Sequence, residues 1–176
     1  MAGSYRYAGR VEHLGLLRSY LTRHGAGPFP TEDSSLDGLA EPHNSHAGWQ
    51  GRFRRGHPDG VLLRYALEVT GWLDGLLISH LDVFAKGLPL KWADGYTNIY
   101  GDRASERMTA CANNNLAYQR SLTDYLTDVQ PDYAPGTVGS SSDLIERFAS
   151  VSNCPVWFGA FGPAHQNVLQ AVNGVF

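Results

Sequence analysis

The pattern of apolar and polar residues divides the chain into segments of helix and strand character. Residues 59–69 (DGVLLRYALEV) bring their apolar side chains onto one helical face, with Asp59 as an N-cap and Gly71 just past the end. Residues 73–82 contain a short continuous apolar run, which predicts a buried strand of a parallel sheet. Residues 12–22, rich in Leu and Tyr, predict another buried strand. The order strand, helix, strand is typical of an α/β protein.

Two further segments have strand character, and one long segment has none. Residues 88–96 predict a strand, and residues 154–163 (CPVWFGAFGP) predict a strand followed by a turn. Residues 28–60 are dominated by Gly, Pro, Ser, His, Asn and Asp, which indicates a long loop region. Loops of this length inside a compact domain are usually functional or disordered.

The remaining helical patterns lie in the second half of the chain. Residues 103–129 predict one or two helices, with an interruption near residues 113–115. Residues 140–152 predict a helix that begins at a serine N-cap, either Ser141 or Ser142. The predicted fold is therefore an α/β sheet, at least partly parallel, with flanking helices.

Composition narrows the class of protein. The chain has 176 residues, of which 43% are hydrophobic and 18% are charged, values that are ordinary for one globular domain. Its formal net charge of -3 argues against a general nucleic-acid binder or a membrane-surface binder. No apolar run approaches the roughly 20 residues that a membrane span needs, and the first residues lack the pattern of a secretory signal. We therefore expect a cytoplasmic protein with neither nucleic-acid nor membrane partners.

Positive charge is concentrated in one glycine-flanked stretch, GWQGRFRRG, at residues 48–56. Alternate side chains of an extended segment point to the same side, so Arg52 and Arg54 are predicted to converge while Arg55 faces elsewhere. Two arginine forks suit one planar anion, a carboxylate or a phosphate. The alternative is a solvated basic loop, although the flanking glycines permit a close approach of the backbone to a ligand.

The apolar run of residues 73–82 ends in Ser-His-Leu-Asp. Ligands of open α/β sheets bind beyond the carboxyl ends of the strands, so Asp82 is in a favourable position. A carboxylate can accept hydrogen bonds from the ring N–H and the exocyclic amino group of guanine, a pair that adenine does not offer. The alternative is that Asp82 caps a turn or pairs with a cation such as Lys86, which is the commoner role of a single aspartate.

Several catalytic and metal-binding patterns are missing from the sequence. His43, His46 and His57 share a loop, but no carboxylate or cysteine spacing around them forms a convincing metal site. Ser, His and Asp are present without a GxSxG motif, so a hydrolase triad is not supported. The sequence also lacks GxxxxGK[ST] and GxGxxG, the usual phosphate-binding loops, and we assign no catalytic residue and no metal ligand.

Four segments, taken in order, resemble the carboxy-terminal part of adenylosuccinate synthetase: LTRHGAGPFPTE, WQGRFRRG, GLLISHLD and FGAFGP. Their spacing resembles that family as well. The resemblance implies a ligase of purine nucleotide biosynthesis that joins IMP to L-aspartate with GTP hydrolysis and Mg²⁺. It also implies a large, mostly parallel sheet like that of P-loop proteins, and a homodimer.

The resemblance implies roles for two groups of residues. The loop that would bind aspartate and IMP consists of Gly48, Trp49, Gln50, Gly51, Arg52, Phe53 and Arg54. Within it, Arg52 would also reach IMP, and Arg54 would contact aspartate or the ribose side of GTP. The residues that would bind GTP, besides Arg54, are His80, Leu81, Asp82, Ala160, Phe161 and Gly162. Asp82 would select guanine, and the GAGPFPTE turn would position the aspartate loop without taking part in catalysis.

Three of these segments depart from the common pattern of the family. Trp49 and Gln50 replace two threonines, a variant similar to the archaeal and viral branches. His80 replaces the usual lysine, and Ala160 with Phe161 replaces a Ser-Thr pair. The sequence therefore leaves open GTP or ATP as the donor, and IMP or dGMP as the acceptor. With dGMP the product would be 2-aminoadenylosuccinate.

The resemblance does not extend to the family's amino-terminal half, which carries the glycine-rich phosphate loop, the catalytic aspartate and the catalytic histidine. We therefore expect residues 1–176 to be a carboxy-terminal portion that is inactive alone, because positioning residues do not replace the base and the electrophile. The magnesium ligands would also belong to the other half. We expect a homodimer or association with a separately encoded amino-terminal half. The alternative is a non-catalytic nucleotide-binding module or a decayed fragment.

Overall fold

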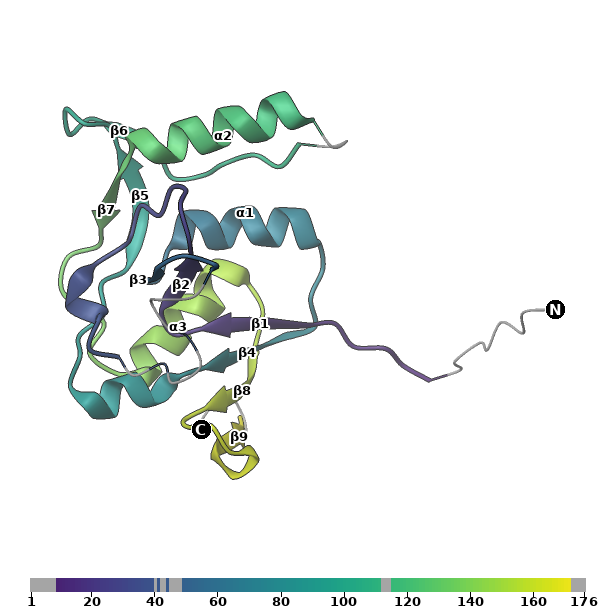
Figure 1. The fold of residues 1–176 in the computed structure, drawn as a ribbon. Helices are drawn as coiled ribbons and strands as arrows, with labels where there is room; N and C mark the ends of the chain where they lie inside the picture. The colour runs from purple at the N-terminus through teal and green to yellow at the C-terminus, as the bar shows by residue number, and fades with distance from the viewer. Residues whose placement is uncertain (1–8, 40, 42–43, 45–48, 112–114, 172–176) are drawn as a thin grey trace.

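The centre of the molecule is a four-stranded sheet, which we call sheet A. The computed structural model describes residues 9–39, 41, 44, 49–111 and 115–171. Sheet A has the order β1-β4-β8-β9, with β1 at Leu14–Arg18, β4 at Gly75–Ser79, β8 at Val156–Ala160 and β9 at Val168–Gln170. β1, β4 and β8 are parallel, and β9 is antiparallel to β8. The prediction of an α/β fold with a mostly parallel sheet is confirmed (Figure 1).

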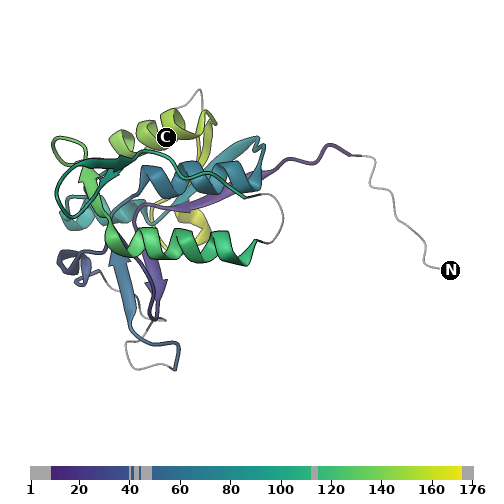
Figure 2. The same ribbon diagram turned by 90° about the horizontal axis from the view of Figure 1, so that it is seen from above.

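Two smaller sheets and the helices surround sheet A. Sheet B pairs β2 (Leu21–His24) with β3 (Phe53–Gly56), and sheet C has the order β6-β5-β7, at Arg103–Ser105, Ala93–Thr97 and Gln130–Tyr133. The α-helices are α1 (Gly60–Thr70), α2 (Leu116–Asp128) and α3 (Ser141–Ser152), and short 3₁₀ helices are η1 (Ser34–Leu36), η2 (Leu81–Lys86) and η3 (His165–Asn167). From above, α1 and α2 run side by side across the molecule (Figure 2). Among the described residues, no helix combines the length and the apolar character that crossing a membrane requires.

Helix α1 begins and ends where the sequence predicts. The carboxylate of Asp59 accepts hydrogen bonds from the backbone N–H groups of Val61 and Leu62, at 2.9 and 3.0 Å. It also accepts one from the hydroxyl of Tyr96 at 2.7 Å, and burial raises the pKa of this carboxyl. Gly71 ends the helix with φ of 78° and ψ of -147°, a positive-φ conformation that glycine reaches more readily than other residues.

The core has two parts that share α1. The larger part lies between sheet A, α1 and α3 and includes Leu76 and Ile78 of β4 together with Leu144 and Phe148 of α3. Trp92 packs edge-on against Phe148, with 5.4 Å between the ring centres. The smaller part lies between α1, sheet C and α2, and its buried members are Val61, Tyr96, Met108 and Val129.

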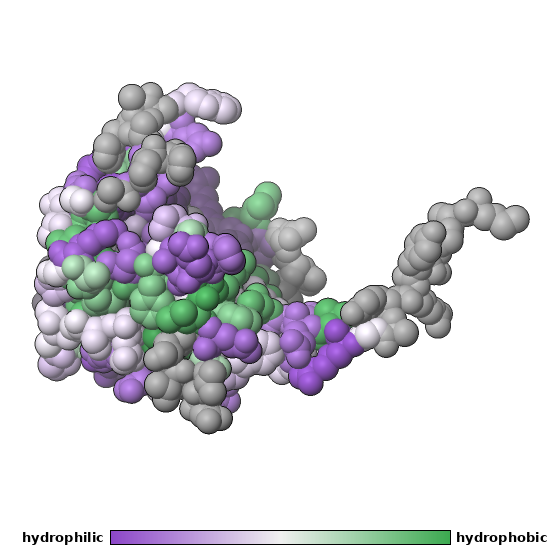
Figure 3. Space-filling model, turned by 90° about the horizontal axis from the view of Figure 1, so that it is seen from below, coloured by the Kyte–Doolittle hydropathy of each residue, from purple (hydrophilic) through white to green (hydrophobic). Residues whose placement is uncertain are grey.

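Sheet A has an outer face that the described residues leave partly open. Since Leu76 and Ile78 point into the core, Leu77 and its register partner Leu16 point to the opposite face, where Leu16 is 73% exposed. Trp157 lies on the same face, over Gly75. A hollow of about 520 Å³ opens beside Trp157 and Phe158. Seen from below, the side on which β8 and β9 lie in Figure 1, apolar side chains gather in the middle of the surface (Figure 3).

Several predicted boundaries are wrong. Residues 12–22 divide into β1 and the start of β2, and β1 is an edge strand rather than a fully buried one. The predicted loop of residues 28–60 contains η1 and β3, because the arginine-rich stretch pairs with β2.

Three further predictions also need correction. Residues 103–105 form β6 instead of a helix, since they pair with β5, and residues 106–111 adopt no regular structure. The N-cap of α3 is Ser140, one residue before the predicted candidates, and its hydroxyl accepts the N–H of Asp143 at 3.1 Å. The predicted strand at residues 88–96 begins its regular part only at Ala93.

Candidate functional site

Two glycine turns lie against each other at the end of sheet B. Gly25 and Gly51 have φ of 70° and 81°. The N–H of Gly25 donates to the carbonyl of Arg52 at 3.1 Å, and a Cβ on Gly51 would lie only 3.0 Å from the Cα of Gly25. The glycines are therefore required by both conformation and close approach. This contact joins the GAGPFP turn to the loop that carries Trp49 and Gln50.

Arg54 holds the GAGPFP turn in shape. Its Nη1 donates to the carbonyls of Gly25 and Gly27 at 3.0 and 2.9 Å, and its Nε and Nη2 donate to Oε2 of Glu32 at 2.9 and 2.6 Å. The guanidinium also lies over the ring of Phe29, 5.3 Å from the ring centre. The hydrogen bonds from Arg54 lower the pKa of Glu32. The single side chain of Arg54 thus fastens the GAGPFP turn, at its start through Gly25 and Gly27 and just beyond its end through Glu32.

Arg55 is also engaged within the protein. Its side chain is only 4% exposed, Nη2 donates to the carbonyl of Leu39 at 2.7 Å, and Nη1 lies 3.5 Å from Oδ1 of Asp37. The guanidinium packs over the ring of Phe53, 4.8 Å from its centre. Arg55 therefore has other partners than Arg54, as its position in the sequence predicts, but it shares Asp37 with Arg52, so the prediction that it faces away from both arginines is wrong for Arg52.

Arg52 is the exposed arginine of the three, with 56% of its side chain accessible. Its Nη2 lies 3.3 Å from Oδ2 of Asp37 and 3.8 Å from Oε1 of Glu32. Arg52 and Arg54 therefore both lie near the carboxylate of Glu32, although the shorter contact of Arg52 is with Asp37; convergence on a ligand anion stays a prediction. Contacts of this kind between exposed charges are weak, so an incoming anion can replace them.

The other residues of the predicted aspartate loop divide into two groups. Trp49 is 98% exposed, and Gln50 is exposed beside it. Phe53 is 2% exposed, and its ring packs 4.9 Å from that of His24. Gly48 lies outside the described residues. Trp49, Gln50 and Arg52 therefore present their side chains to solvent, while Phe53 and Arg54 point inward.

The predicted guanine-binding segments meet at the carboxyl ends of the parallel strands. The N–H of Ser19, after β1, donates to the carbonyl of Ser79 at 2.9 Å, and the hydroxyl of Ser19 donates to the carbonyl of His80 at 2.7 Å. The pairing of Ile78 with Gly159 places the ends of β4 and β8 at the same level. Residues 80–82, which follow β4, and residues 160–162, which begin with the last residue of β8, consequently lie at the carboxyl ends of neighbouring strands of sheet A.

The side chains of these two segments differ in accessibility. His80 adopts a left-handed conformation with φ of 62°, and Leu81 is 1% exposed, so its side chain belongs to the core. Asp82 accepts a hydrogen bond from Nζ of Lys86 at 2.7 Å, which is the alternative that its sequence position suggests. Ala160 is 8% exposed, and a Cβ on Gly162 would lie 2.8 Å from the amide of Asn167.

A polar cluster that we did not predict lies between the two regions. The hydroxyl of Tyr20 donates to Oε1 of Glu41 at 2.6 Å, and Arg18 donates to both of them. Burial acts to raise the pKa of Glu41, but the bonds from Tyr20 and the charge of Arg18 lower it overall; burial raises the pKa of Tyr20 to about 12. The ring of Tyr20 is edge-on to His80 at 5.7 Å. Arg18 and Tyr20 lie within residues 12–22, which the sequence predicts to be one buried strand, so no local pattern indicates this cluster.

Among the described residues, histidines and other metal-ligating side chains form no further site. Of the three loop histidines, His57 is buried and bonded to Asp33, whereas His43 and His46 lie outside the described residues. In the part of the chain that the structure describes, no group of three or more His, Cys, Asp or Glu side chains is arranged to hold a metal ion.

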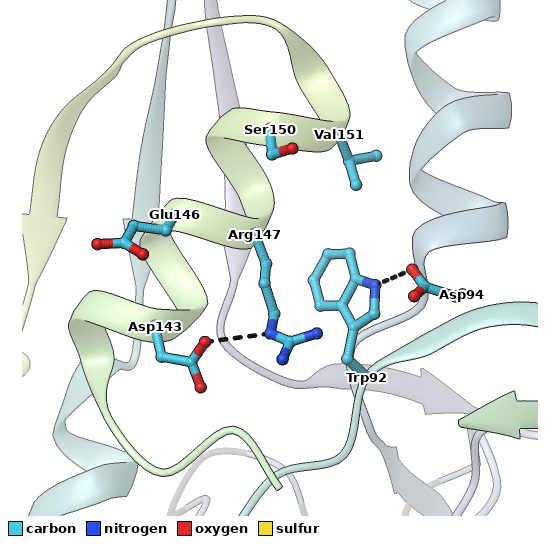
Figure 4. A pocket seen from close by; sticks show the side chains of 7 residues that line it. All are labelled: Trp92, Asp94, Asp143, Glu146, Arg147, Ser150 and Val151. Carbon is cyan, nitrogen blue, oxygen red and sulfur yellow. Dashed lines mark hydrogen bonds and ion pairs between the residues drawn. The ribbon is translucent and has the colours of Figure 1, made fainter. Parts of the chain in front are cut away.

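Two hollows lie near these elements. One of about 440 Å³ is bounded by the GAGPFP turn, Arg54 and α2. Another of about 360 Å³ lies beside α3, where Arg147 donates to Asp143 at 3.2 Å and the indole of Trp92 donates to Asp94 at 2.6 Å (Figure 4). The second hollow contains none of the predicted site residues, and these polar groups pair with one another, so we assign it no ligand.

Comparison with known proteins agrees with this arrangement. The sequence profile of the adenylosuccinate synthetase family matches residues 4–134. An adenylosuccinate synthetase of Geotalea uraniireducens is 27% identical over 174 residues, covering 92% of this chain and 38% of the relative. One of Nitrosomonas eutropha is 31% identical over 168 residues, covering 85% of this chain and 36% of the relative.

A solved structure shares the fold. It is described as the structure of fully ligated adenylosuccinate synthetase from Plasmodium falciparum, with a TM-score of 0.67 and 18% identity, covering 96% of this chain and 42% of that chain. The chain thus spans about two fifths of the length of the relatives that it matches. Because the family profile matches most of the sequence, the chain belongs to the adenylosuccinate synthetase family.

Proposed function

We propose that this chain forms the aspartate-binding and guanine-binding part of an enzyme that joins IMP to L-aspartate with hydrolysis of GTP. The observation that carries the proposal is the contrast among the three arginines. Arg54 and Arg55 are engaged by the protein itself, whereas Arg52 is 56% exposed at the glycine turns and, among the described residues, is held by two carboxylates. An arginine in this state is suited to a dicarboxylic substrate.

On the aspartate side, binding is an exchange of carboxylates. A carboxylate of L-aspartate takes the place of Asp37, whose Oδ2 lies 3.3 Å from Nη2 of Arg52. Asp37 then keeps its contact with Arg55 at 3.5 Å, so it is not left without a cation. Glu32 keeps its two hydrogen bonds from Arg54, and the turn therefore remains in place during the exchange.

On the guanine side, Asp82 supplies the acceptor that distinguishes guanine from adenine. It is 30% exposed and engaged by Lys86, an exposed pair of the kind that costs little to separate. Residues 160–162 after β8 line the opposite side of the base. The use of GTP rather than ATP rests on this one carboxylate.

Catalysis requires groups that the described residues do not supply. The family's magnesium would accompany GTP, but the described residues offer no fitting ligand set, so we derive no step through the metal. The rest of the family fold, in this molecule or another, would supply the base and the phosphate-binding groups. We propose that it covers the open edge of β1 and the apolar outer face around Leu16 and Trp157. A homodimer is proposed on the same family basis.

The proposal is tested by release of phosphate from GTP in the presence of IMP, L-aspartate and Mg²⁺. The chain is assayed alone and after mixing with the amino-terminal portion of a related synthetase. We expect no turnover alone and IMP-dependent and aspartate-dependent turnover after mixing. The Arg52→Ala variant is the control, and it should mix equally well but turn over poorly with aspartate.

Other outcomes identify the alternatives. Turnover by the chain alone would show that it contains its own base and phosphate site. No turnover in either case, with GTP still bound, would favour a non-catalytic nucleotide-binding module. Preference for dGMP over IMP in the mixed assay would assign the chain to the formation of 2-aminoadenylosuccinate.

A further inference from the structure

The segment that carries Glu32 is held from behind by a buried histidine. Residues 31–33 run antiparallel to the end of β3: the N–H of His57 donates to the carbonyl of Thr31 at 3.0 Å, and the N–H of Asp33 donates to the carbonyl of Arg55 at 3.0 Å. The side chains of His57 and Asp33 add a further contact, 3.1 Å between Nε2 and Oδ2. Glu32 therefore lies between two residues that are both fastened to residues 55–57.

The hydrogen bonds of His57 determine its tautomer. Nδ1 lies 3.2 Å from the backbone nitrogen of Lys91, which can only donate, so Nδ1 must be the unprotonated acceptor. The proton of the neutral ring is consequently on Nε2 and is donated to Asp33. With 1% exposure, the ring has no water to replace either partner. His57 thus connects the segment of Glu32 with the backbone that leads into β5.

The charged and titratable groups around His57 are Asp33, Lys91, Tyr133 and Asp59. Asp33, the N-cap of η1, also accepts a hydrogen bond from Nζ of Lys91 at 3.2 Å. Tyr133 of β7 presents its ring edge-on to His57 at 5.6 Å and lies under Nζ of Lys91 at 5.2 Å. Asp59, two residues further along the chain, is buried and bonded to Tyr96.

We propose that His57 is a positioning residue that fixes Glu32, and through it Arg52 and Arg54, only while the imidazole is neutral. A second proton on Nδ1 would point at the N–H of Lys91, so that hydrogen bond is lost and the ring must move. The movement is transmitted to Asp33, which shares its Oδ2 between the ring and Lys91. Glu32 is the preceding residue; it accepts two hydrogen bonds from Arg54 and lies 3.8 Å from Nη2 of Arg52. The inference deepens the proposed function, because Arg52 is the arginine assigned to aspartate.

The electrostatics favour the neutral ring. Burial lowers the pKa of His57 below its ordinary 6.5, and Lys91 acts in the same direction, although Asp33 opposes them. A histidine with a lowered pKa binds a proton less readily in the folded state than in the unfolded state. The free energy of unfolding therefore decreases as the pH falls below about 6.5, and this loss ends once the folded state is protonated as well.

The test is nitrogen-15 NMR of the full chain over pH 5 to 8, without any ligand. We expect His57 to be the Nε2–H tautomer at neutral pH, and the Nε–H signals of Arg52 and Arg54 to shift with the same midpoint as His57. In His57→Gln, which keeps an N–H donor toward Asp33 but has no proton to gain, that transition should disappear. The control is His13→Gln, an exposed histidine just before β1 with no role in either proposed subsite, which should keep it.

Two results would overturn the inference. One is an Nδ1–H tautomer of His57, and the other is an unchanged arginine transition in His57→Gln. If that variant does not fold, Asp33→Asn tests the same link, because it should separate the arginine signals from the titration of His57. In the mixed assay, kcat/KM for aspartate should fall at acid pH in wild type and less in His57→Gln, whereas kcat/KM for GTP should not distinguish them. Failure of the proposed function would remove only this last readout.

Discussion

The two proposed subsites are built by different means. At the glycine turns, the shape depends on charge: Arg54 holds two carbonyls and Glu32, and Arg55 holds Leu39 and Asp37. At the carboxyl ends of the strands of sheet A, the shape depends on the backbone. Three parallel strands end side by side there, and Leu81 anchors residues 80–82 in the core. The first subsite is therefore fastened by side chains and the second by the sheet.

This difference separates structural from ligand-binding roles. In a region fastened by side chains, most charged residues are occupied, and only the exposed one is available to a ligand. Where backbone hydrogen bonds fix the structure, a charged side chain such as Asp82 contributes little to the fold, apart from one exposed ion pair with Lys86. Arginines that are adjacent in sequence consequently have unequal roles, while the lone aspartate can be changed with little effect on the fold.

The largest effect should come from Arg54→Ala. It removes four hydrogen bonds, so the carbonyls of Gly25 and Gly27 lose the donor that Arg54 supplies, and Glu32 retains the 3.8 Å contact with Arg52. We expect the free energy of unfolding, measured by urea titration, to fall by about 2 to 4 kcal/mol. The matched control is Arg52→Ala, for which we expect a change within about 1 kcal/mol. Equal losses in the two variants would remove the distinction between them.

The next largest effect should be on GTP binding at the carboxyl end of β4. Asp82→Asn should weaken GTP binding about tenfold and ATP binding much less, because an amide replaces the acceptor carboxylate. Binding is measured by titration calorimetry on the protein combined with the amino-terminal portion of a relative, with the unfolding free energy as a check that the fold is unchanged. Equal weakening for both nucleotides would remove the guanine assignment from Asp82.

The smallest effect should be a gain. Asp37→Asn removes the carboxylate that competes for Arg52, so the KM for aspartate in the mixed assay should fall by about two- to fourfold. The stability should decrease slightly, because Asp37 also lies 3.5 Å from the buried Arg55. A rise in KM would mean that Asp37 assists substrate binding instead of competing with it.

Strong local signals in the sequence predicted much of the fold. The capping of α1 by Asp59, the buried strand β4 and the strand β8 follow from patterns within about ten residues, and all are confirmed. The error at residues 103–111 has the opposite origin, since β6 exists because it pairs with β5. Ser140 was missed in a run of three serines that are equivalent by pattern, because the sequence does not say which of them has an extended backbone.

The site was less accessible to sequence reasoning. Alternation predicted that Arg52 and Arg54 point to the same side, but the carboxylate that both lie near, that of Glu32, lies some twenty residues earlier and is brought near by the hairpin. The hydrogen bond from Arg54 to the carbonyl of Gly25 and the Tyr20–Glu41 contact also join residues that are distant in sequence. Such contacts depend on tertiary structure and have no local pattern.

The most direct test of the central claim is an NMR titration of the full chain with L-aspartate, observing the Nε–H signals of the arginines at neutral pH. The account predicts that the Arg52 signal shifts with ligand concentration, while those of Arg54 and Arg55 stay almost unchanged because their partners are within the protein. A larger shift at Arg54 than at Arg52, or no shift at Arg52, would contradict it.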